Sequence, residues 1–136
     1  MYSRILVPMA LDHDLSEHTL AVATALAGDG GQITALHVYE APQGSVRAYL
    51  DDEMIEEGFK RAKERLHEKT AAHPQLSALI VKGHTYRTII DHATDHGIDC
   101  IVIGSHKPGL SDYLLGSTAA RVVRHAPCAV HVYRSS

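Results

Sequence analysis

The stretch Cys100–Val123, CIVIGSHKPGLSDYLLGSTAARVV, decides the expected fold. It opens with a short apolar run that ends at Gly104 and has the length and composition of a strand buried on both faces. A loop rich in glycine and serine follows, and after Gly116 the apolar residues recur with helical spacing. This order of strand, loop and helix is typical of βα units, which form parallel sheets covered by helices.

The same order of elements suits a bound phosphate. Free N–H groups in the first turn of a helix attract an anion, and Ser117 and Thr118 would begin this helix. Lys107 could add a positive charge from the loop, while Gly104 and Gly116 would let the backbone approach the anion closely. A plain βα connection that binds nothing fits the pattern equally well, so the pattern alone leaves both interpretations open.

Three segments resemble the universal stress protein family. They are SRILVPM near the start, ITALHVYEAP in the middle and GSHKPGLSDYLLGSTAARVVRHAPCAVHV near the end, so the resemblance covers essentially the whole chain. Gly104, Gly116 and Ser117 match the family motif Gly-x2-Gly-x9-Gly-Ser/Thr, whereas Lys107 stands at its second glycine. Eleven residues separate Gly104 from Gly116, one fewer than in the motif. This shorter His-Lys-Pro loop resembles one branch of the family.

The resemblance implies an adenine-nucleotide site at the carboxyl ends of the first and fourth strands. Phosphates would lie over the loop from Gly104 to Gly116, and the Pro8 and Val38 regions would hold the ribose and the base. The residues expected at the site are Pro8, Met9, Ala10, Val38, Gly104, His106, Lys107, Gly116, Ser117 and Thr118. In the family an aspartate commonly stands two residues after that proline, where this chain has Ala10. The implied ligand is ATP or another adenine nucleotide, and the resemblance leaves Mg²⁺ open.

Composition and charge exclude several classes of protein. The chain has 136 residues, which suits a single domain over 1–136, and its net charge of −3 gives no electrostatic case for binding nucleic acid. Its longest apolar run, Ile5 to Leu11, is far too short to span a bilayer, and no signal-peptide cleavage pattern follows it. We therefore expect a cytoplasmic protein without a nucleic-acid or membrane partner. Cys100 and Cys128 are then expected to be thiols rather than a disulfide.

The other segments complete an alternation of strands and helices. Strands are predicted at 4–9, 32–39, 78–81, 100–104 and 128–133, with a helix between each pair and the longest helix at 50–72. Thr85 is the expected cap of the third helix. Five strands and four helices in alternation predict parallel pairing in a three-layer α/β sandwich. The strand order 3-2-1-4-5 is suggested by doubly wound, flavodoxin-like winding and by the adenine-nucleotide α-hydrolase-like fold that the resemblance implies. It would bring the loops after Pro8 and Gly104 to one crevice.

The last predicted strand, Cys128–Tyr133, is expected at an edge of this sheet. An exposed apolar edge tends to pair with another chain unless something covers it. The family commonly pairs this strand with its twin across a two-fold axis. We therefore expect a homodimer through Cys128–Tyr133.

Histidines and hydroxyl groups raise the question of metal binding or catalysis. His92 and His96 lie four residues apart, as two metal ligands on a helix would, but no third ligand stands beside them and no metal site is predicted. His37 is expected to be a hydrogen-bonded histidine of the sheet. We expect a nucleotide-binding stress-response module rather than an enzyme, and slow ATP hydrolysis or self-phosphorylation at Ser117 or Thr118 is left open. The alternative is a nucleotide-free dimeric scaffold whose shortened loop fills the cleft.

Overall fold

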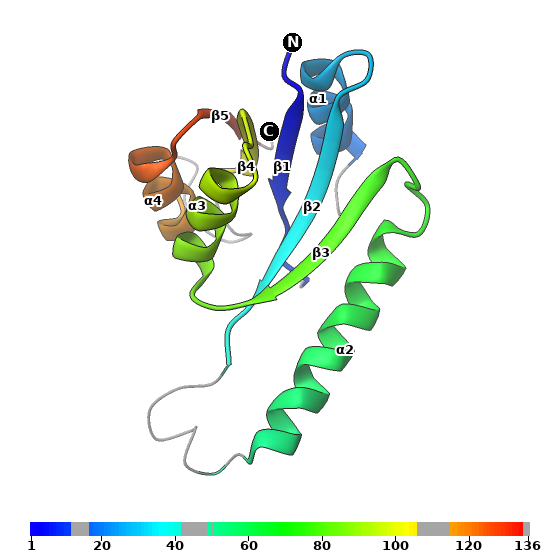
Figure 1. Cartoon of the computed structure of the whole chain (residues 1–136), viewed down its shortest axis with the longest axis vertical. Helices are drawn as coiled ribbons and strands as arrows, with labels where there is room; N and C mark the ends of the chain where they lie inside the picture. Colours follow the sequence, from blue (N-terminus) through cyan, green and yellow to red (C-terminus); the bar gives the residue numbers. More distant parts are fainter. Residues whose placement is uncertain (12–16, 42–48, 50, 106–114, 135–136) are drawn as a thin grey trace.

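The chain forms a three-layer α/β sandwich. The computed structural model describes residues 1–11, 17–41, 49, 51–105 and 115–134. In chain order the elements are β1 (Arg4–Pro8), α1 (Glu17–Ala27), β2 (Gln32–Tyr39), α2 (Asp52–Thr70), β3 (Leu76–Lys82), α3 (Thr85–Asp95), β4 (Cys100–Gly104), α4 (Ser117–His125) and β5 (Ala129–Tyr133). The strands are parallel and lie in the order β3-β2-β1-β4-β5, with α1 and α2 on one face and α3 and α4 on the other (Figure 1). The predicted architecture and strand order are confirmed.

Side chains of the two central strands alternate between two apolar cores. In β1, Ile5 and Val7 pack with α1 and α2, whereas Leu6 packs with α3 and α4. In β4, Val102 belongs to the first core and Ile101 to the second. All five side chains are at most 3% exposed. Strands covered on both faces must be apolar throughout, which is why β1 and β4 stand out in the sequence.

Element boundaries differ from the prediction mainly at the edges of the sheet. β1 ends at Pro8, one residue earlier than predicted, and β5 begins at Ala129 rather than at Cys128. β3 covers Leu76–Lys82, which is longer than the predicted 78–81, because it pairs along most of β2. Its residues alternate between half-buried and exposed. An edge strand of this mixed character lacks a continuous apolar run, so its length is underestimated from the sequence.

The long helix α2 extends beyond the sheet that it covers (Figure 1). Its buried residues, Ala62, Leu66 and Thr70, all lie in its C-terminal half. Nearer its start, Gly58 allows the Tyr39 hydroxyl to approach, since a Cβ at this position would collide with it. None of the helices in the described part of the chain combines the length and apolar character that a membrane span requires.

Candidate functional site

A pocket of about 350 Å³ opens at the carboxyl ends of β1, β2 and β4. This volume lies within the range of small-molecule sites. The described residues that line it are Pro8, Met9, Ala10, Leu36, His37, Val38, Thr85, Ile89, Ile103, Gly104, Ser105, Gly116, Ser117, Thr118 and Ala119. In this strand order the winding of the sheet reverses between β1 and β4, which is where ligands bind in open α/β sheets.

The pocket brings together eight of the ten residues expected at the site. They are Pro8, Met9, Ala10, Val38, Gly104, Gly116, Ser117 and Thr118. The other two, His106 and Lys107, lie outside the described residues. Four separate segments therefore meet at one place: the loop after β1, the end of β2, the end of β4 and the start of α4.

The helix α4 begins at the pocket without a side-chain cap. Its N-cap residue is Gly116, which has no side chain that could accept a hydrogen bond. The Gly116 amide itself donates to the Ser105 carbonyl at 2.6 Å. The next amides, of Ser117 and Thr118, have no acceptor within their own helix and none among the described residues. The positive end of the helix dipole adds to their attraction for an anion.

The helix α3 also begins at the pocket, but its first turn is already occupied. The amide and the hydroxyl of Thr85 both donate to Glu40 Oε1, each at 2.6 Å. The prediction of Thr85 as the cap is wrong: the N-cap residue is His84, whose side chain makes no capping hydrogen bond. Instead, Glu40 reaches across from just beyond β2. Its negative charge lies at the positive end of α3 and fills that anion position.

The inner wall of the pocket is apolar. It is formed by buried side chains of the sheet, α3 and α4: Leu36, Val38, Ile89, Ile103 and Ala119. A Cβ placed on Gly104 would meet nothing within 4 Å, so the missing side chain leaves open space. Gly104 and Gly116 both have negative φ. At Gly104 the glycine thus provides room rather than an unusual backbone conformation.

Hydrogen bonds to β2 hold the loop after β1 at the pocket edge. The Met9 amide donates to the Leu36 carbonyl, and His37 Nδ1 donates to the Met9 carbonyl, both at 2.8 Å. A carbonyl can only accept, so Nδ1 carries the proton. The expectation of a hydrogen-bonded histidine in the sheet is confirmed for His37, whose place at the pocket was not predicted.

The described lining of the pocket contains no Asp, Glu, Lys or Arg, and the described residues give no sign of a metal site. Because this lining holds no carboxylate, Mg²⁺ would depend on oxygen atoms of the ligand and of water. His92 and His96 stack with ring centroids 4.0 Å apart. Within the described residues no three metal-ligating side chains gather. What the described pocket offers chemically is amide donation to an anion and contact with an apolar group.

Glu40 and Ser105 were not among the ten residues expected at this site, although the sequence places Ser105 in the loop that follows Gly104. Ser105 is 3% exposed, and it joins two elements because its amide donates to the Tyr133 carbonyl at 2.8 Å and its carbonyl accepts from Gly116. A signal for Ser105 exists, since it directly follows the strand at the pocket. No comparable signal marks Glu40, which lies in a polar loop and acts on a helix 45 residues away.

Comparison with known proteins identifies relatives along the whole chain. The model of the universal stress protein family matches residues 1–134. Universal stress protein G of Shigella flexneri is 32% identical, over 98% of this chain and 100% of its own. Among solved structures, universal stress protein UspA from Lactobacillus plantarum has a TM-score of 0.73 at 29% identity and covers 98% of each chain.

Two further solved structures carry a nucleotide. One is a universal stress protein in complex with cAMP, with a TM-score of 0.61 at 24% identity over 99% of this chain and 98% of that one. The other is a universal stress family protein from Arabidopsis thaliana with AMP bound, with a TM-score of 0.61 at 20% identity over 98% and 92%. At these identities the likeness shows a shared fold.

Proposed function

The chain belongs to the universal stress protein family, and we propose that it is a cytoplasmic regulatory module of the stress response that binds an adenine nucleotide. The observation that carries this proposal is the uncapped start of α4, where the amides of Ser117 and Thr118 line a pocket with an apolar inner wall. A phosphate joined to a flat heterocycle matches both features. The AMP and cAMP bound by structural neighbours support this ligand class.

The starts of α3 and α4 determine the orientation of the proposed ligand in the pocket. Its phosphate accepts from the Ser117 and Thr118 amides, with the open space at Gly104 beside it. The Glu40 carboxylate at the start of α3 repels a second anion. The base therefore lies toward the apolar end of β2, within reach of the Val38 backbone.

The remaining expected residues take supporting roles in the same proposal. Pro8, Met9 and Ala10 border the ribose from the loop after β1. His106 and Lys107 add donors and positive charge to the phosphates. Mg²⁺, where the nucleotide carries it, binds to phosphate oxygens rather than to a carboxylate of the described lining.

We propose a homodimer through β5 as the assembled form. This strand lies at an edge of the sheet, and its neighbour on the inner side is β4. Pairing of two identical edges across a two-fold axis removes both unpaired edges. Sedimentation velocity tests this proposal: Val130→Pro, within β5, should shift the protein toward the monomer.

Calorimetric titration with AMP, ADP, ATP and cAMP tests the nucleotide proposal. We expect saturable binding of at least one of them, with a dissociation constant below about 1 mM and a Tm that rises with ligand concentration. GTP is the matched control, because it presents the same phosphates on a different base. No saturable binding at millimolar nucleotide rejects the proposal, and equal binding of GTP rejects its adenine preference.

A nucleotide-free scaffold is the second candidate. It is favoured by one observation, the hydrogen bond from the Gly116 amide to the Ser105 carbonyl, which uses an amide of the pocket for the chain's own structure. In this alternative the start of α4 serves only to join α4 to β4. It predicts no nucleotide in the purified protein and no change of Tm with any of the four ligands.

A further inference from the structure

Two arginines and two histidines surround Tyr86 where α3 and α4 pack together. The guanidinium carbon of Arg121 lies 5.0 Å from the centroid of the tyrosine ring, and that of Arg87 lies 5.9 Å from it. The ring centroids of His84 and His125 lie at 5.0 and 6.3 Å. Arg87 Nε also donates to the Tyr86 hydroxyl at 3.2 Å. We call these five residues the cationic cluster.

The two arginines of the cationic cluster have no ion-pair partner among the described residues. The sequence of α4 also contains no acidic residue. Asp91 attracts Arg87 without pairing with it. The hydrogen bond from Arg87, followed by the charges of Arg87 and Arg121, lowers the pKa of Tyr86, although partial desolvation opposes this. The tyrosine thus lies in a positive field.

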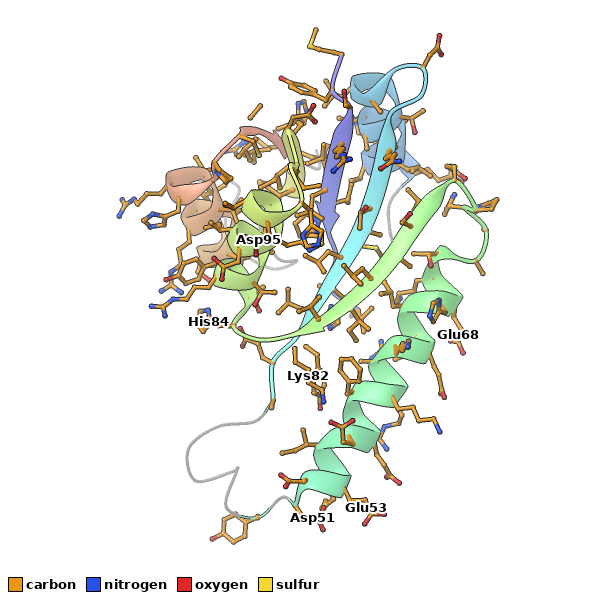
Figure 2. The ribbon with its side chains drawn as sticks, in the orientation of Figure 1. Asp51, Glu53, Glu68, Lys82, His84 and Asp95 are labelled. Atoms are coloured by element: carbon orange, nitrogen blue, oxygen red, sulfur yellow. The ribbon has the colours of Figure 1, made fainter. Side chains whose placement is uncertain are left out.

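Negative charge gathers at the start of α2. Five exposed carboxylates occur there within seven residues: Asp51, Asp52, Glu53, Glu56 and Glu57. Figure 2 shows Asp51 and Glu53 at the end of α2 that projects beyond the sheet, well apart from His84 of the cationic cluster. We call Asp51–Glu57 the acidic tip. Because the two surfaces lie apart, one molecule cannot bring its own tip to its own cluster.

Two carboxylates of the acidic tip are unused within the described structure. Asp51 caps α2, and Glu56 pairs with Lys82. Glu53 and Glu57, one helical turn apart, form no ion pair or hydrogen bond with another described residue. Like charges at this spacing repel each other, and the helix dipole offsets that repulsion only in the first turn. A cationic partner would relieve it.

The open shape of the cationic cluster suits a protein surface better than a small anion. None of its five residues lines the pocket described above, whereas small ligands are held in concave sites. Arginine and tyrosine are, with tryptophan, enriched at the centres of protein contacts. The other surface also has exposed apolar side chains that can pack against the Tyr86 ring. They are Met54 in the acidic tip, 51% exposed, and Tyr49 just before it, 86% exposed.

We propose that the acidic tip of one molecule docks on the cationic cluster of a second copy of this chain. The two surfaces differ, so the contact is head-to-tail and can add further copies at each end. It uses neither the pocket nor β5, and it therefore stands apart from the proposed function. Because exposed charges carry the contact, salt should weaken it.

Sedimentation velocity of the full chain at several concentrations tests the proposal. We expect species larger than the basal oligomer to grow between about 10 µM and about 1 mM protein. These species should form at about 0.02 M salt and disperse at about 0.5 M. Pairing through β5 is a backbone contact and should not respond to salt in this way.

Charge reversal distinguishes the two surfaces. Glu53→Lys with Glu57→Lys reverses the two carboxylates of the acidic tip that have no described partner, and Arg87→Glu with Arg121→Glu reverses the two arginines of the cationic cluster. The first pair removes most of the negative charge of the tip and the second turns attraction into repulsion, so each should raise the dissociation constant of the larger species about tenfold or more. A mixture of the two variants should associate, because the unchanged tip of one meets the unchanged cluster of the other. One chain with all four changes should recover association in part, because opposite charges then face each other at these four positions.

Glu64→Lys with Glu68→Lys is the matched control for the acidic tip. It makes the same charge change at the same spacing on exposed positions of α2 outside the tip, and it should leave association intact. A wild-type chain that never exceeds its basal oligomer, or a loss of association that the four changes do not restore, overturns the proposal. So does binding of an oligoglutamate peptide to the cationic cluster without self-association, since the partner would then be another protein.

Discussion

The helices α3 and α4 both begin at the pocket, yet their first turns are satisfied in opposite ways. At α3 the Glu40 carboxylate accepts from the amide and hydroxyl of Thr85. At α4 the N-cap is Gly116, and no described side chain accepts from the Ser117 amide. One helix start is thus closed by an anion of the chain, while the other can receive an anion from outside.

This difference shows what a binding site at a helix start requires. A side-chain cap stabilises a helix by about 1 kcal/mol relative to alanine and by a few tenths of a kcal/mol relative to glycine. A helix whose first amides hold a ligand must forgo that cap when the ligand is absent, so its sequence should lack a capping side chain. Gly116 fits this requirement at α4. Substitutions that add an acidic cap at the start of α4, or remove the Glu40 acceptor at the start of α3, therefore test the proposed site directly.

Gly116→Asp should make α4 resemble α3 and have the largest effect. The φ of −58° and ψ of 153° at Gly116 suit any residue. The aspartate would accept from the amides that the nucleotide uses and would repel its phosphate, so affinity should fall about a hundredfold. The free energy of unfolding without ligand should rise by up to about 1 kcal/mol. Calorimetry and denaturant unfolding measure the two opposite changes.

Gly116→Asn is the matched control for that variant. It caps the helix equally well but carries no charge, so it should weaken nucleotide binding less than Gly116→Asp does. If Gly116→Asp binds nucleotide as tightly as the wild type, the phosphate does not lie at the start of α4.

Ser117→Pro removes one amide from the same helix start and should have the second largest effect. Proline is tolerated at the first helical position, where its missing N–H has no helical acceptor. The extended backbone of Gly116 suits the residue before a proline. One hydrogen bond to a charged group is lost, so nucleotide affinity should fall about tenfold with little change in the free energy of unfolding. Ser117→Ala keeps the amide, and equal losses in both variants would assign binding to the hydroxyl.

Glu40→Ala should open the start of α3, with a smaller effect. It removes the acceptor for both Thr85 donors, so the free energy of unfolding should fall by about 1 kcal/mol. The start of α3 then resembles that of α4, and inorganic phosphate should raise the Tm of the variant more than that of the wild type. Glu40→Gln keeps an acceptor and should lose less stability. The same response to phosphate in variant and wild type would show that Glu40 blocks no anion position.

The centre of the sheet was predictable from the sequence, whereas its edges were less so. Ile5–Val7 and Ile101–Ile103 are buried on both faces of the sheet, which leaves an uninterrupted apolar run. β3, at an edge, alternates between half-buried and exposed residues and was predicted too short. Its length depends on pairing with β2, which is a contact between segments distant in sequence.

In the candidate site, too, one part was predictable from the sequence and another was not. The start of α4 follows from the local order of strand, loop and helix around Gly104 and Gly116, so the sequence indicates it. The hydrogen bonds between Glu40 and Thr85 join residues 45 apart, and they exist only because β2 and β3 pair side by side. Local patterns carry no information about such a contact. The contrast between α3 and α4 therefore became visible only in the structure.

The helices α3 and α4 also differ at their C-terminal ends. Here we expect the smallest of the predicted effects, a change of stability with pH. His92 lies near the end of α3, and burial, followed by the positive charge of His96, lowers its pKa below the ordinary value near 6.5. The unfolded chain then binds this proton more readily than the folded chain does. The free energy of unfolding should therefore fall as the pH drops below about 6.5 and level off below the folded pKa. Acid should loosen α3, whereas the last turn of α4 carries Arg124 and His125, both exposed to solvent.

His92→Gln should flatten this part of the pH profile, measured by denaturant unfolding between about pH 5 and about pH 8. His96→Gln is the matched control, because burial, the larger cause, persists at His92 and should keep most of the slope. Carboxylates affect stability in a lower pH range. Burial opposes ionisation of Asp99, but hydrogen bonds from the Ser3 and Arg4 amides outweigh it and lower the pKa of this carboxyl. Its contribution to stability is lost only below about pH 4. A His92→Gln profile as steep as that of the wild type would place the acid-sensitive group outside α3.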